Sequence, residues 1–71
     1  MPTYEFPIRS FYINKRDELY VQTYENETFA RIMRKHTNKY VAIKFGKNQV
    51  YGRVIRSTKS SVYFKDWSFI Q

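Results

Sequence analysis

Apolar residues alternate with polar ones over most of this chain, a pattern typical of β-strands that bury one face. The first alternating segments cover residues 4–13 and 19–24, and the polar residues 14–17 between them predict a β-hairpin. Pro7 cannot donate a hydrogen bond to a neighbouring strand. We therefore expect the first strand to lie at a sheet edge or to carry a bulge.

The period changes to that of a helix after the hairpin, because apolar residues then recur at intervals of three and four. We expect a helix over about residues 27–37, with Asn26 as its N-terminal cap and Asn38 as its end. A helix of about three turns needs packing against the rest of the domain to persist. Its apolar face carries Phe29, Ile32, Met33 and His36.

Alternation returns in residues 40–45, 49–57 and 62–67, and the turns at 46–48 and 58–61 connect these segments. This pattern predicts a three-stranded antiparallel meander over about residues 40–67. One set of its alternate residues is apolar, and we expect this set to form a core that the helix partly covers. The set consists of Val41, Ile43, Phe45, Val50, Val54, Val62 and Phe64.

The predicted fold is thus a single small α+β domain over residues 1–71, rich in β-structure, which could close into a small barrel of the SH3-like or Sm-like kind. A chain of 71 residues without cysteine has neither disulfides nor thiolate metal sites to stabilise it. Seven Tyr, six Phe and one Trp can supply the missing apolar area.

Positive charge is concentrated in the second part of the chain. Residues 1–30 carry three basic and five acidic side chains, a net charge of −2, whereas residues 31–71 carry ten basic and one acidic, a net charge of +9. A field concentrated in this way favours a polyanionic partner.

The other set of alternate residues in the meander combines rings with cations. Rings can stack on unpaired bases, and Lys and Arg neutralise phosphates. We therefore expect a non-catalytic protein that binds nucleic acid, single-stranded RNA or DNA in particular, through this face. The expected binding residues are Tyr40, Lys44, Tyr51, Arg53, Tyr63, Lys65 and Trp67. A supporting basic patch is expected from Arg31, Arg34, Lys35, Lys47, Arg56 and Lys59.

Two alternatives stay open. Apolar residues of the N-terminal hairpin could fold over the Tyr51, Tyr63 and Trp67 side and turn it into a second core. The Tyr-rich, Arg-containing surface would also suit a protein-interaction module that acts as an accessory or inhibitory factor on a larger nucleic-acid-processing assembly with an acidic surface. The sequence does not specify the oligomeric state.

Catalysis and membrane insertion are not expected. His36 has no second His, no Cys and no suitably spaced acid beside it, so a packed or boundary position suits it better than a metal site or a base. We expect no cofactor and no metal. No apolar run approaches the roughly 20 residues of a membrane span, and the N-terminal residues do not read as a secretory signal. These features favour a soluble, cytoplasmic protein.

Residues 50–54, Val-Tyr-Gly-Arg-Val, follow a predicted helix and a strand that ends near a glycine. Over about residues 28–67 this order resembles the Sm-like RNA-binding barrels. The spacing between the glycines differs, the usual Asn-Gly turn is absent, and SH3-like barrels fit equally well. No family is assigned on this basis, and no residue role is taken from one.

Overall fold

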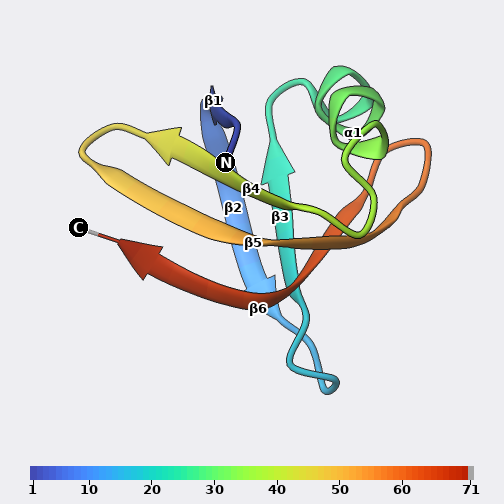
Figure 1. Ribbon diagram of the computed structural model, residues 1–71. Coiled ribbons are helices and arrows are strands. Elements are labelled where there is room, and N and C mark those ends of the chain that lie inside the picture. Colours follow the sequence, from blue (N-terminus) through green and yellow to red (C-terminus); the bar gives the residue numbers. More distant parts are fainter. Residues whose placement is uncertain (71) are drawn as a thin grey trace.

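In the computed structural model, which describes residues 1–70, one mixed sheet of six strands carries a single helix (Figure 1). The coarse prediction of a small, β-rich α+β domain with one short helix is confirmed. The elements are β1 (Thr3–Glu5), β2 (Ile8–Ile13), β3 (Leu19–Thr23), α1 (Asn26–Arg34), β4 (Tyr40–Phe45), β5 (Asn48–Ser57) and β6 (Val62–Ile70).

The strands lie in the order β1-β4-β5-β6-β3-β2. β4, β5 and β6 pair antiparallel as predicted, but they form the middle of a larger sheet whose order is not that of a simple meander. β1 pairs parallel with β4 at one edge, and the β2–β3 hairpin joins β6 at the other. The two edges do not pair, so the sheet does not close into the SH3-like or Sm-like barrel that the sequence left possible.

Pro7 explains why the first predicted strand divides into two. Its missing N–H interrupts the ladder, so β1 ends at Glu5, β2 begins at Ile8, and the two halves pair with strands that lie far apart in the sheet. Both β1 and β2 are edge strands, as the proline predicts, and a bulge follows between Ile8 and Ser10.

The core lies between α1 and one face of the sheet, which we call the inner face; the opposite face is the outer face. Phe29 is buried against the ring of Phe6, with the centroids 4.8 Å apart. Ser57 also joins the helix to β5, since its Oγ donates to the carbonyl oxygen of Ala30 at 2.8 Å. The predicted core set is buried on this face except for Phe45, which is half-buried.

The helix is shorter than predicted. It ends at Arg34, and the chain continues as a turn to Asn38, whose φ of 67° is left-handed and prevents further helix. Asn26 is not the N-terminal cap: it is the first helical residue, and its Oδ1 accepts instead from the backbone N–H of Thr23 at 2.7 Å. This bond closes the turn between β3 and α1.

The hairpin extends the sheet, with its buried apolar side chains on the inner face, and leaves the outer face uncovered. Phe6, Leu19 and Val21 are buried in the same core cluster as the meander residues, whereas Tyr51 and Tyr63 stay half-buried. The alternative in which the hairpin seals the outer face is therefore wrong. Within residues 1–70, no helix has the length and apolar character needed to span a bilayer.

Candidate functional site

A row of tyrosines crosses the outer face from the sheet edge towards its middle. Tyr12 on β2, Tyr20 on β3 and Tyr63 on β6 occupy successive cross-strand positions. The ring centroids of Tyr12 and Tyr20 are 5.0 Å apart, and those of Tyr20 and Tyr63 are 5.2 Å apart. Arg56 on β5 completes this tyrosine row, because its guanidinium carbon lies 4.2 Å from the centroid of Tyr63.

A second row, the basic row, runs beside the first over the middle of the sheet. Arg53 on β5 pairs in register with Tyr40 on β4 and with Lys65 on β6. Tyr51 stands next to it, with its ring 6.4 Å from that of Tyr40. Arg53 is held by Asp66, whose Oδ2 accepts from its Nη2 at 3.1 Å. The two rows place rings and cations side by side on one surface.

A carboxylate on the outer face fixes Arg56. Glu18 is buried, and its Oε1 lies 3.4 Å from Nη2 of Arg56 and accepts from Nδ2 of Asn14 at 2.8 Å. The hydrogen bond from Asn14, together with the positive charge of Arg56, holds the pKa of Glu18 below its ordinary value, although burial acts in the opposite direction. Arg56 is thus held between a carboxylate and a ring, with its side chain 44% exposed.

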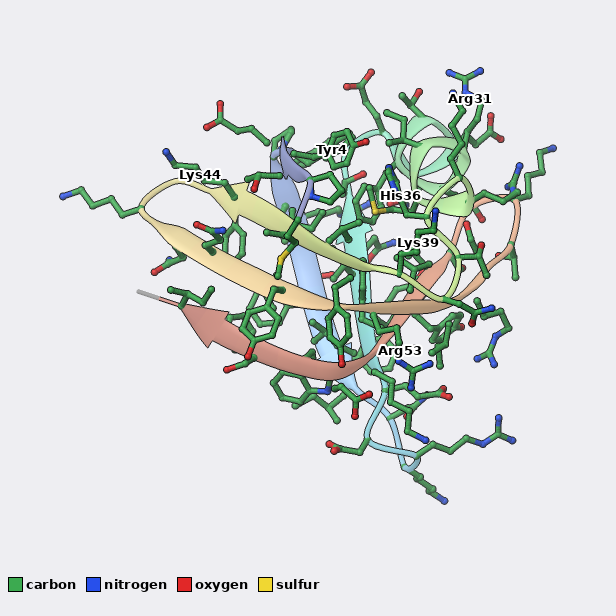
Figure 2. The ribbon with its side chains drawn as sticks, viewed as in Figure 1. Tyr4, Arg31, His36, Lys39, Lys44 and Arg53 are labelled. Atoms are coloured by element: carbon green, nitrogen blue, oxygen red, sulfur yellow. The ribbon has the colours of Figure 1, made fainter. Side chains whose placement is uncertain are left out.

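Of the seven predicted site residues, six lie on the outer face. Lys44 is exposed near the far end of β4, and Figure 2 shows it well separated from Arg53 on β5. On β4, Ala42 lies between Lys44 and Tyr40, which is the register partner of Arg53, and Ala42 is buried between its own partners Thr3 and Tyr51. The six are Tyr40, Lys44, Tyr51, Arg53, Tyr63 and Lys65.

Trp67 is not on the outer face, and the expected position is wrong. The register of β5 and β6 shifts between Tyr51 and Arg53, so β6 has one extra residue there. Asp66 occupies this bulge with a φ of 53°. The alternation is therefore reversed: Trp67 packs against the core beside Gly52, and its Nε1 donates to the carbonyl oxygen of Asp17 at 3.0 Å.

The residues of the supporting patch are dispersed. Arg31 and Lys35 are exposed on and just after α1, and Figure 2 shows Arg31 pointing away from the sheet. Arg34 donates to the carbonyl oxygen of Thr58 at 2.9 Å. Lys47 lies in the β4–β5 turn, and Lys59 in the β5–β6 turn faces Glu27 at 3.9 Å. Arg56 alone of this group is shown in contact with the tyrosine row.

The expected site did not include Tyr12 and Tyr20, because the binding face was sought in the meander alone. The available signal was their alternation with Leu19 and Val21, which are buried. The sequence analysis also placed Arg56 only in the supporting basic patch. A second register shift, between Val54 and Arg56, brings Arg56 opposite Tyr63.

His36 occupies a boundary position. It is half-buried, and Nε2 lies 2.6 Å from the hydroxyl oxygen of Tyr4 on β1 (Figure 2). Among residues 1–70, no three His, Asp or Glu side chains are grouped closely enough to hold a metal ion. The arrangement on the outer face provides stacking surfaces and hydrogen-bond donors, which are means of binding.

Comparison of the chain with protein-family models, with curated proteins and with solved structures finds no match in any of the three.

Proposed function

We propose that the protein binds single-stranded nucleic acid, RNA or DNA, through the outer face of its sheet. The observation that carries this proposal is the tyrosine row with Arg56 at its end, beside the basic row of Tyr40, Arg53 and Lys65. Stacking of one base on an aromatic side chain contributes about 1–3 kcal/mol, and it needs an unpaired base.

The charge of the surface supports the same partner. Lys44, Arg56 and Lys65 are exposed on the outer face, and Asp66 is the one acidic residue of the sequence from 31 to 71. Asp66 already pairs with Arg53. A phosphate that approaches this face therefore meets few competing carboxylates, and release of counterions adds salt-dependent affinity.

The test measures the affinity for a fluorescent oligothymidylate by anisotropy over a series of salt concentrations. For single strands the log-log slope changes by about 0.7 per phosphate contact, so Lys44→Ala with Lys65→Ala should lower its magnitude by roughly 1.4 and weaken binding. Both side chains are exposed, so the fold should be retained. The matched control is Arg31→Ala with Lys35→Ala, which removes two exposed cations from the region of α1.

A salt-independent affinity, or no detectable binding at low salt, would rule out this proposal. Equal losses in the two double variants would show a diffuse electrostatic attraction without a defined face. A larger loss in the control would move the site to the helix.

A second candidate function, that of a protein-interaction module, is favoured by a different surface. Beyond the region that α1 covers, the inner face ends in an aromatic cluster of Phe11, Phe45, Trp67 and Phe69. Phe11 and Phe69 are 43% and 42% exposed. Exposed aromatic groups of this kind are enriched at protein interfaces, and the net charge of +7 favours an acidic partner surface on a nucleic-acid-processing assembly.

A pull-down with and without nuclease distinguishes the two proposed functions. A partner that persists after nuclease treatment and is lost with Phe69→Ser supports the interaction module. A partner that nuclease removes, and that Phe69→Ser leaves unchanged, supports nucleic-acid binding alone.

A further inference from the structure

The free edge of β2 is apolar and exposed. β2 is the last strand of the sheet and pairs only with β3. Phe11, Tyr12 and Ile13 are 43%, 55% and 50% exposed. Edge strands commonly avoid unwanted pairing by charges, prolines or bulges. These three consecutive residues carry no charge and no proline, so this part of the edge is open to another strand.

The hydrogen-bonding pattern of the hairpin determines which backbone groups point outward. The N–H of Asn14 donates to the carbonyl oxygen of Glu18 at 3.0 Å. In an antiparallel pair, hydrogen-bonded and non-hydrogen-bonded positions alternate. From Asn14 backwards along β2, Tyr12 therefore bonds to its register partner Tyr20, whereas the N–H and C=O groups of Phe11 and Ile13 face away from β3.

We propose that two copies of the chain pair through their β2 strands, antiparallel and about a two-fold axis. The bulge between Ile8 and Ser10 disturbs the edge at Arg9, so the regular outward groups are those of Phe11 and Ile13. All of these N–H and C=O groups form hydrogen bonds between the two strands when Phe11 of one copy lies opposite Ile13 of the other. In this register Tyr12 lies directly opposite Tyr12 of the partner subunit, at the axis.

This register joins the outer faces of the two copies. Tyr12 ends the tyrosine row at the edge of the sheet, so pairing at the axis makes one continuous row from Arg56 of one copy to Arg56 of the other. Closed two-fold pairing of this kind is the commonest form of self-association. A gain in oligonucleotide affinity upon pairing rests on the proposed function; the pairing itself does not.

Charge gives the dimer an unusual salt dependence. The same register brings Arg9 of one copy opposite Lys15 of the other, and each copy carries a net charge of +7. Salt screens this repulsion, so the dimer should become tighter as salt rises. Binding of nucleic acid should become weaker over the same range. The two processes can therefore be told apart in one titration.

The experiment is sedimentation velocity of the full chain without nucleic acid, at protein concentrations up to about 1 mM, where millimolar dissociation constants are detected. The wild type should show a species of twice the monomer mass of 8.7 kDa, whose share rises with protein concentration. Tyr12→Lys alone and Tyr12→Glu alone each place like charges at the axis and should raise the dissociation constant at least tenfold. An equimolar mixture of the two should restore the dimer, because only unlike copies can then pair.

Tyr24 supplies the matched control. It is 70% exposed and lies beyond β3, so Tyr24→Lys and Tyr24→Glu change surface charge equally without touching the axis. Their dimers should match that of the wild type. A backbone test avoids the tyrosine altogether: Ile13→Pro removes an outward N–H and should prevent pairing, while Ile13→Ala keeps the N–H and should pair more tightly than Ile13→Pro.

A wild type that remains monomeric at the highest concentration and high salt overturns the proposal. A dimer that survives in both single-charge variants places the contact elsewhere and also overturns it. Neither outcome bears on oligonucleotide binding by the monomer, so failure of the dimer and failure of the proposed function are distinguishable.

Discussion

The two faces of β5 and β6 are built from adjacent residues and differ in almost every property. On the inner face Val54, Val62 and Phe64 are at most 2% exposed. On the outer face Arg53 and Tyr63 alternate with them but remain in contact with solvent. The inner residues must be apolar and must fit their neighbours, because interiors are closely packed. The outer residues have no such constraint, so their rings and cations require another reason.

The largest difference between the two faces should appear in the free energy of unfolding when Phe64 on the inner face or Tyr63 on the outer face is truncated. Phe64→Ala should lower the free energy of unfolding by about 3–5 kcal/mol, because it leaves a cavity beside Phe29. Tyr63→Ala should cost about 1 kcal/mol of stability but should reduce oligonucleotide affinity by about 1–3 kcal/mol. Urea unfolding monitored by circular dichroism, together with anisotropy titration, checks both values. Equal stability losses would contradict the distinction between the faces.

The next largest loss of stability should follow from adding a methyl group to the inner face. A Cβ at Gly52 would lie 3.0 Å from Cβ of Phe64 and 3.1 Å from Cβ of Trp67, and neither atom is at the flexible end of a side chain. Gly52→Ala should therefore lower the free energy of unfolding by about 1–3 kcal/mol. A denaturation midpoint equal to that of the wild type would show that β5 and β6 can separate at this point without cost.

The position of Trp67 on the inner face allows a third test, with a smaller expected change in stability. Trp67→Phe removes the hydrogen bond to Asp17 and should cost about 1 kcal/mol. In the wild type, the fluorescence of Trp67 should change on unfolding and stay constant when an oligonucleotide binds. The double variant Trp67→Phe with Tyr63→Trp moves the only tryptophan of the chain to the tyrosine row. Its emission should be quenched by the oligonucleotide; the opposite pattern would exchange the roles of the two faces.

The smallest effect should be a pH dependence that originates at Glu18. The pKa of Glu18 is lower in the folded state than its ordinary value of 4.5, so its contribution to stability is complete above that value and is lost as pH falls through the folded pKa. Glu18→Gln should therefore make the urea midpoint less sensitive to pH below about 4.5. Asp17→Asn, at an exposed neighbour, is the control and should leave the dependence unchanged.

Much of the architecture could be predicted from residue patterns. Alternation identified the three central strands and the apolar set of the core, and the interval of three to four residues identified the helix. Both signals arise from local geometry, so they do not depend on which strands later pair. The order of the sheet does depend on pairing, and the sequence provides no local signal that β1 lies beside β4 or that β3 lies beside β6.

Two errors in the site, the positions of Trp67 and Arg56, have one physical cause. A pattern of alternation assumes an uninterrupted strand, and β6 contains a bulge at Asp66 while β5 shifts register near Ile55. The first moves Trp67 to the inner face, and the second brings Arg56 onto Tyr63. An aspartate within a strand is a weak signal of such a bulge, because Asp is depleted in regular strands and enriched at left-handed positions. The placement of the tyrosines and of Lys65 before the bulge was unaffected.

Asp66 marks a position at which the last strand can change length. It is the one extra residue between the pairs Arg53–Lys65 and Tyr51–Ser68, so its deletion would place Trp67 directly after Lys65 and opposite Gly52. Trp67 and Phe69 would still face inward, and Ser68 would still face outward. When homologous sequences are aligned, a gap at this column therefore needs no exchange of residue types over the rest of β6.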